Sequence, residues 1–163
     1  MPERRYWLVK SEPGDYSFQD LQSEEDQTAE WDGIRSYAGR NTMRDEMQVG
    51  DGVLFYHSNA KPNAVVGYAT VARSGYPDDT AWDPESQHPD PRSTPEDPVW
   101  FMVDIKAEAA FSNPVPLAQI RDTAELRDMV LVNNSRLSVQ PVTPEEWAIV
   151  LSMGMESQDD GPS

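Results

Sequence analysis

Cysteine is absent from this chain of 163 residues, and histidine occurs only twice, at His57 and His88. The lack of cysteine excludes a disulfide framework and a thiol nucleophile. A structural zinc site needs cysteines or several histidines, so we expect no metal and no other cofactor. No apolar run approaches the length of a transmembrane helix, and no long apolar stretch follows Arg4 and Arg5 as it would in a signal peptide. We therefore expect a cytoplasmic protein without membrane contact.

Lysine is scarce as well. Three lysines and ten arginines stand against 29 acidic residues, and the net charge is −16. Proteins that bind nucleic acid tightly and without sequence preference are normally basic. Either the partner is not nucleic acid, or it is held in a small pocket on an acidic body. An excess of acid also suits a high-salt habitat, in which charges are screened.

The motifs of common enzyme classes are missing too. The chain has no Gly-x-Ser-x-Gly elbow, and Gly33 and Gly39 are too sparse for a phosphate-binding loop. His57 and Ser58 are adjacent, but neighbours on a strand point to opposite faces. Paired catalytic carboxylates stay open as an alternative in so acidic a chain, although no apolar pocket motif marks them. We therefore expect a protein that is not an enzyme.

Length and a hydrophobic content of 37% indicate one domain with a single core, placed at residues 1–155. The polar tail of residues 156–163 is expected to be disordered. Apolar and β-branched runs predict strands, and shorter periodic segments predict helices. The strands are expected at 6–10, 53–57, 64–72, 99–107 and 137–142. A short helix capped by Asp15 or Ser17 is expected through Phe18 and Leu21, a second at 37–47, and two short helical turns at 116–127. This α+β pattern favours a small, partly open β-barrel of five or six strands, flanked by short helices and a C-terminal helix.

The C-terminal helix has the clearest signals in the sequence. Residues 143–146, Thr-Pro-Glu-Glu, form a capping box with proline at the first helical position. Trp147, Val150 and Leu151 are spaced as the buried stripe of the helix. Gly154 is expected just beyond the last turn, where glycine commonly ends a helix.

A long loop is expected at residues 75–98. It holds six of the fourteen prolines and seven acidic residues against one base, Arg92. Such a segment is either a solvated insertion or a lid over a site, anchored by Tyr76 and Trp82. We expect anchored ends and a mobile middle, with His88 exposed to solvent.

Residues 31–41, Trp-Asp-Gly-Ile-Arg-Ser-Tyr-Ala-Gly-Arg-Asn, combine aromatic rings, arginines, glycines and an amide with little apolar periodicity. Such groups suit a planar polar ligand, since a ring stacks on it, an arginine or amide bonds its edge, and glycine lets the backbone approach. The alternative for Trp31 is a place in the core. Tyr37 serves equally well as a second wall or as a core anchor.

Arg35 and Arg40 lie five residues apart, so on a helix they do not share a face. At least one of them is therefore expected to be structural, and Asp32 and Asp51 are its candidate partners. Asn41 is open to the simpler interpretation of a residue on the helix surface.

Several blocks in this order resemble the EVE domain family. They are Tyr6–Pro13, Trp31–Asn41, Gly50-Asp51, Phe55–Asn59, Tyr76–Asp78 and Ser135–Val142, and they span nearly the whole chain. The resemblance implies a PUA-like β-barrel related to the YTH domain, which holds a methylated adenine in an aromatic cage. It also implies binding of modified bases in DNA or RNA, methylcytosine and hydroxymethylcytosine among them. The chain departs from the family pattern at Ser36, at Ala38-Gly39 and in its acidic loop.

The resemblance and the residue chemistry together predict one pocket. Trp31 corresponds to the cage tryptophan, and Asp32 or Glu12 can accept a hydrogen bond from a cytosine N4 amine. The predicted ligand-binding residues are Ser11, Glu12, Trp31, Asp32, Gly33, Arg35, Tyr37, Arg40, Asn41, His57, Ser58, Asn59, Arg136 and Ser138. The expected protein is a monomeric module that binds DNA or RNA carrying a modified base. An RNA-binding module without modification preference and a small-molecule enzyme are the alternatives.

Overall fold

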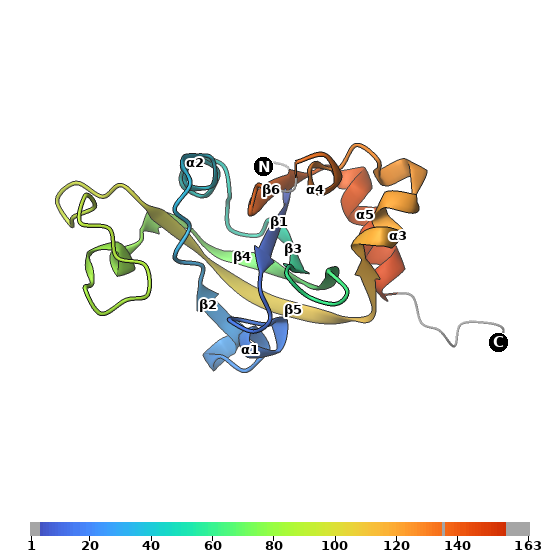
Figure 1. Cartoon of the computed structure of the whole chain (residues 1–163), viewed down its shortest axis with the longest axis horizontal. Helices are drawn as coiled ribbons and strands as arrows, with labels where there is room; N and C mark the ends of the chain where they lie inside the picture. Colours follow the sequence, from blue (N-terminus) through green and yellow to red (C-terminus); the bar gives the residue numbers. More distant parts are fainter. Residues whose placement is uncertain (1–3, 135, 156–163) are drawn as a thin grey trace.

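The computed structural model describes residues 4–134 and 136–155, and the tail predicted at 156–163 lies outside them. Its centre is a mixed six-stranded sheet with the order β2-β5-β4-β3-β1-β6 (Figure 1). The strands are β1 (Tyr6–Ser11), β2 (Thr28–Glu30), β3 (Gly52–His57), β4 (Ala64–Pro77), β5 (Phe101–Pro116) and β6 (Val139–Val142). Strands β2 and β6 form the two edges and are not paired with each other, so the sheet is open. The predicted α+β fold of five or six strands with short helices and a C-terminal helix is confirmed, and the partly open barrel that was expected takes the form of a mixed sheet that does not close.

Parallel pairing of β1 with β3 is the feature that positions the site. Ser11 lies opposite His57 in the last pair of this ladder. The segments that follow β1 and β3 therefore leave the sheet side by side, at the carboxyl ends of the two strands. Antiparallel pairing joins β1 to β6, β3 to β4, β4 to β5 and β5 to β2. The long hairpin of β4 and β5 extends well beyond the body of the sheet and carries the acidic loop at its far end (Figure 1).

Strands β1 and β3 are buried on both faces, and their side chains alternate between two apolar clusters. Trp7 and Phe55 point into one cluster, whereas Leu8 and Leu54 point into the other. This alternation is the period of two that a strand imposes. Because both faces of β1 and β3 are buried, most residues of these strands are apolar.

Helices cover both faces of the sheet. α1 (Phe18–Gln22) and α2 (Tyr37–Asp45) contribute buried residues to the cluster that contains Phe55. α3 (Leu117–Asp122), α4 (Val130–Asn133) and α5 (Pro144–Met155) pack on the cluster that contains Leu54. Three 3₁₀ turns complete the described fold at Glu25–Gln27, Asp79–Trp82 and Ala124–Leu126. Among the described residues, no helix has the length and apolar character needed to cross a membrane.

The predicted capping box of α5 is present. The Thr143 hydroxyl accepts a hydrogen bond from the Glu146 amide at 3.1 Å, and the Glu146 carboxylate accepts one from the Thr143 amide at 3.0 Å. The prediction for Gly154 is wrong, because this residue lies inside the helix. A Cβ at Gly154 would collide with the ring of Phe111 from β5, so glycine is required there for close packing.

Replacement of Thr143 by alanine is expected to lower the free energy of unfolding by about 0.5–2 kcal/mol, because the first turn of α5 loses its side-chain acceptor. Urea unfolding followed by circular dichroism measures the change. Ser152→Ala, at an exposed position of the same helix, is the matched control and should change stability very little. Equal stability of the two variants would show that the box contributes nothing.

Candidate functional site

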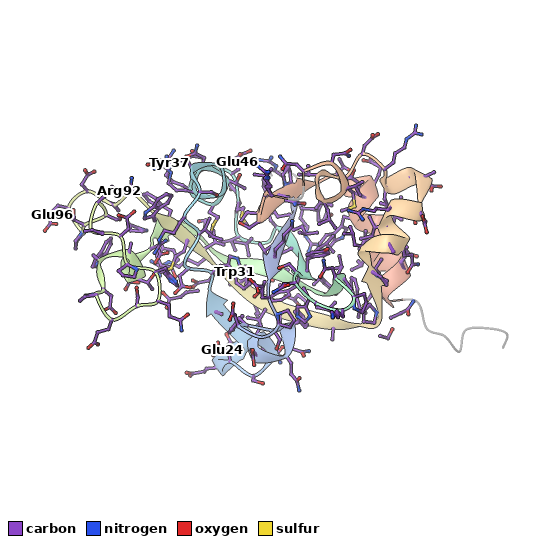
Figure 2. All side chains as sticks on the ribbon, viewed as in Figure 1. Glu24, Trp31, Tyr37, Glu46, Arg92 and Glu96 are labelled. Atoms are coloured by element: carbon purple, nitrogen blue, oxygen red, sulfur yellow. The ribbon has the colours of Figure 1, made fainter. Side chains whose placement is uncertain are left out.

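A cavity of about 580 Å³ opens beside β2, where the chain leaves the sheet edge at Trp31. This volume lies within the range of about 300–1,000 Å³ that is usual for small-molecule sites. In Figure 2, Trp31 lies near the centre of the molecule and Glu24 lies below it, close to α1. The cavity is lined by Asp15, Tyr16, Glu24, Thr28, Ala29, Glu30, Trp31, Asp32 and Gln87.

Trp31 is at once a core residue and part of the cavity wall. Only 7% of its surface is exposed, and its ring lies edge-on to Phe55 and Tyr16, with centroids 5.4 and 6.1 Å away. Its amide donates to the Val103 carbonyl of β5 at 2.7 Å. Trp31 thus lies in the core and also lines the cavity, and its role as a stacking surface stays a prediction. The half-buried Tyr16 supplies the second aromatic residue of the cavity lining.

Four carboxylates line the cavity, and within the described residues none of them pairs with a lysine or arginine. Glu24 accepts a hydrogen bond from the Tyr16 hydroxyl at 2.6 Å, and Asp32 lies 3.7 Å from Nε2 of His88. Burial raises the pKa of Asp32, with a further contribution from the nearby charge of Asp78 and an opposing one from His88.

Glu30 is in a similar electrostatic position. Glu30 is an exposed residue, but partial desolvation of its carboxyl and the charge of Asp79 raise the pKa, although Tyr76 donates a hydrogen bond to it at 3.3 Å. The same hydroxyl also donates to Asp104, which lies directly across from Glu30 in the pairing of β2 with β5. Tyr76 therefore bridges two acids of the sheet, and the cavity wall keeps an excess of negative charge.

Arg35 fastens the acidic loop to the segment after Trp31. Its guanidinium lies 2.9 Å from the carboxylate of Asp78 and donates to the His88 carbonyl at 2.8 Å. The fully buried Asp78 also accepts from the Gly33 amide at 2.9 Å and from Thr80. Burial alone would raise the pKa of Asp78, but the hydrogen bonds from Thr80, Gly33 and Arg35 outweigh it and lower the pKa. Arg35 is therefore the structural arginine.

Two further expectations for this region are wrong. Arg35 pairs with Asp78 and not with Asp32 or Asp51, since Asp51 accepts from the Trp7 indole at 2.9 Å and serves the fold elsewhere. His88 is half-buried and packs against the backbone of Gly33, whose φ of +81° and lack of a Cβ leave room for the imidazole.

The acidic loop is held in its middle as well as at its ends. The Asp90 amide donates to the Ala81 carbonyl at 2.6 Å, and the Trp100 indole donates to the Asp90 carboxylate at 2.7 Å. Ser86 donates to the Thr80 carbonyl at 2.6 Å. Bonds along its length thus position Gln87 in the cavity wall.

The predicted residues of α2 do not line the cavity. Tyr37 is 54% exposed and stacks on Trp100 at 5.2 Å, and the Arg40 guanidinium lies 4.9 Å from the Tyr37 ring centroid. Arg40 also donates to the Val99 carbonyl at 3.0 Å and to the Asn41 side chain at 3.0 Å. Figure 2 shows Tyr37 at the upper edge of the molecule, far from Trp31 in that view.

A second group of predicted residues gathers where β1 and β3 end. The Ser11 carbonyl accepts a hydrogen bond from the Ser58 amide at 3.0 Å, and the Asn59 side chain donates one to the Glu12 carboxylate at 2.9 Å. Nε2 of His57 accepts a hydrogen bond from the Phe18 amide at 3.1 Å, and burial lowers the pKa of this imidazole.

This second group is connected to the cavity through Tyr16. The Ser11 hydroxyl donates to the Tyr16 carbonyl and so holds the loop that carries the aromatic wall. Ser138 adjoins the group, because its carbonyl accepts a hydrogen bond from the Lys10 amide at 3.0 Å. Arg136 lies two residues before Ser138 and is exposed. Of the fourteen predicted residues, only Trp31 and Asp32 line the cavity itself.

Sequence reasoning missed most of the cavity wall. Tyr16 has a signal in retrospect, since it is a lone aromatic residue between Asp15 and Ser17 in a polar loop. Glu30 was visible only as a neighbour of Trp31. Gln87 has no local signal, because its place depends on the docking of the acidic loop.

The match to a known family covers nearly all of the chain. The model of the EVE domain matches residues 5–153. The chain belongs to the EVE domain family. Among curated relatives, this EVE domain is 38% identical to thymocyte nuclear protein 1 of Danio rerio, over 95% of this chain and 74% of the relative. It is 36% identical to thymocyte nuclear protein 1 of Homo sapiens, over 91% of this chain and 73% of the relative.

Solved structures of the family agree with the fold. A hypothetical protein from Leishmania major is 46% identical to this EVE domain and superposes with a TM-score of 0.89, over 94% of this chain and 96% of that chain. The human THYN1 protein, solved in complex with DNA that contains 5-methylcytosine, is 35% identical with a TM-score of 0.88. That likeness covers 94% of this chain and 99% of the human chain.

Proposed function

We propose that this EVE domain is a non-enzymatic module that binds nucleic acid and accepts a modified base in the cavity beside Trp31. The observation that carries the proposal is the likeness to the human THYN1 protein, which was solved with DNA containing 5-methylcytosine. The cavity adds chemical support. Tyr16 and Trp31 offer aromatic surface, and Glu30 and Asp32 offer acceptors for an exocyclic amine such as cytosine N4. A base reaches such a site after it leaves the stack.

The uneven distribution of charge explains how so acidic a chain can approach phosphates. Residues 12–32 hold eight acids and no base, and residues 78–97 hold seven acids and one arginine. The rest of the chain, apart from residues 156–163, contains eleven acidic and twelve basic residues. Two of these bases, Lys61 and Arg136, are exposed in the segments that follow β3 and precede β6. We infer that the phosphate backbone runs over this side, while the acidic segments surround the base.

Single-stranded oligonucleotides that each carry one modified base provide the test. At least one modified base is expected to bind about tenfold more tightly than its unmodified parent, which corresponds to about 1.4 kcal/mol. Fluorescence anisotropy measures this with DNA and RNA probes that contain 5-methylcytosine, 5-hydroxymethylcytosine or N6-methyladenine. Glu30→Gln should weaken the preference, whereas Glu25→Gln, an exposed acid outside the cavity, is the matched control.

Each alternative function gives a different result in this assay. Equal affinity for modified and unmodified probes would indicate a nucleic-acid module without modification preference. Failure to bind any probe, together with turnover of free nucleosides, would instead indicate a small-molecule enzyme.

A further inference from the structure

The cavity contains uncompensated negative charge. Its four lining carboxylates, Asp15, Glu24, Glu30 and Asp32, come from three separate segments of the chain around the α1 region and β2. Within residues 4–134 and 136–155, no lysine or arginine lies within ion-pair distance of any of them. The arginine nearest in sequence, Arg35, is committed to Asp78 and to the His88 carbonyl.

The surrounding residues increase this charge further. Asp78 and Asp79 act on Asp32 and Glu30 from the docked loop, and both lining carboxyls have a raised pKa as a result of burial and of these neighbours. His88 lies beside the lining residues, with its Nε2 3.7 Å from the Asp32 carboxylate. A cation in the cavity would therefore gain from carboxylates that no lysine or arginine of the described residues pairs with.

The aromatic walls restrict the kind of cation. Tyr16 and Trp31 both line the cavity, and their ring planes stand at 71° to each other, so the pair offers aromatic surface in two orientations to a flat ligand. An aromatic face attracts a cation that lies over it, and attracts a flat, delocalised cation by stacking as well. A phosphate group is excluded by the same carboxylates.

We propose that the cavity selects a base that is cationic at neutral pH, that is, a base methylated on a ring nitrogen such as N3-methylcytosine or N1-methyladenine. This inference rests on the proposed function, because it assumes that a base enters the cavity. Methylation at N3 of cytosine or N1 of adenine occupies a ring lone pair and gives the base a positive charge, which 5-methylcytosine and N6-methyladenine lack. Glu30 and Asp32 pair with that charge and with the amine beside it, and Tyr16 stacks on the ring.

Isomeric probes isolate the effect of charge. N3-methylcytosine and 5-methylcytosine have the same atoms apart from one proton, and so do N1-methyladenine and N6-methyladenine. Single-stranded probes remove the difference in Watson–Crick pairing between the isomers. At neutral pH and low salt, isothermal titration calorimetry is expected to give at least tenfold tighter binding of each cationic isomer. Higher salt should reduce the preference, because screening weakens the charge pairing.

Substitutions then assign the preference to the cavity. Glu30→Gln/Asp32→Asn should reduce the preference for the cationic isomers to less than threefold. Glu25→Gln/Asp26→Asn removes the same amount of charge from exposed acids outside the cavity and should retain it. Circular dichroism checks the fold of both variants, and the single variant of the exposed Glu30 replaces the double variant if the latter does not fold.

The outcomes separate the two proposals. Tighter binding of 5-methylcytosine than of N3-methylcytosine would overturn the charge selection and leave the modified-base function intact. A cationic preference that persists in Glu30→Gln/Asp32→Asn would overturn its assignment to this cavity. Failure of all four modified probes to bind would overturn the proposed function itself.

Discussion

Replacement of Trp31 by alanine is expected to lower the free energy of unfolding by about 3–5 kcal/mol, the range for removing a large buried aromatic side chain. The ring is 7% exposed and packs on Phe55 and Tyr16 in the cluster between the sheet and α2, so its loss leaves a void in the core. Urea unfolding monitored by circular dichroism measures the change.

Tyr37→Ala is the control for this prediction. Its ring is 54% exposed and stacks on Trp100 at the surface, so the expected loss is much smaller than for Trp31. If Trp31→Ala unfolds at the urea concentration of the wild type, Trp31 contributes little to the core. Loss of ligand binding by Trp31→Ala would carry no information on the cavity unless the variant is shown to be folded.

Replacement of Arg35 by alanine is expected to cost at least about 3 kcal/mol, the lower end of the range for breaking a buried ion pair. Asp78 is fully buried and would keep its charge with only Gly33 and Thr80 as donors. The loop would also lose the bond from Arg35 to the His88 carbonyl. Thermal and urea unfolding both report this loss.

Arg44→Ala is the matched control, since its ion pair with Asp45 is exposed and solvent screening leaves such a pair little effect on stability. Equal stability of Arg35→Ala and Arg44→Ala would contradict the structural role of Arg35. Hydrogen exchange of residues 78–98 provides a second readout, because undocking of the loop should raise exchange there and leave β1 and β3 protected.

The dependence of stability on pH follows from the same groups. The pKa of Asp78 is lowered in the folded protein, so its contribution is present above the ordinary carboxyl pKa of 3.8 and is lost as the pH falls through the folded value. The pKa values of Asp32 and Glu30 are raised, so their cost is absent at low pH and appears as the pH rises through the folded values. Arg35→Ala should reduce the loss of unfolding free energy that Asp78 causes as the pH falls below 3.8. It should leave unchanged the dependence on rising pH that comes from Asp32 and Glu30.

Local signals account for the parts of the fold that could be predicted. The apolar runs of β1 and β3 and the capping box of α5 depend on residues next to one another, and all three appear as expected. β2 is only three residues long and exists because β5 pairs with it, so no local pattern predicts it. The prediction that Gly154 ends the helix failed for the same reason, since the Phe111 ring that requires glycine there belongs to β5, which is distant in sequence.

The site shows the same division. Trp31 and Asp32 belong to one conspicuous block of sequence, and both line the cavity. The pairing of Arg35 with Asp78 joins residues 43 positions apart, and neither residue type nor spacing distinguishes Asp78 from the other acids of the loop. The family resemblance was confirmed by the match to the EVE domain, yet it did not indicate Tyr16 as the second aromatic wall.

The short strands at the two borders of the sheet bear on self-association. A long bare border exposes amide and carbonyl groups that can hydrogen-bond a second molecule strand to strand, which leads to dimers or fibrils. β2 offers three residues that end in the acidic Glu30, and β6 offers four residues that include Pro141, which lacks an amide hydrogen. Neither β2 nor β6 is therefore a good template for strand-to-strand pairing with another copy, and we do not expect pairing through β2 to cover the opening of the cavity beside it.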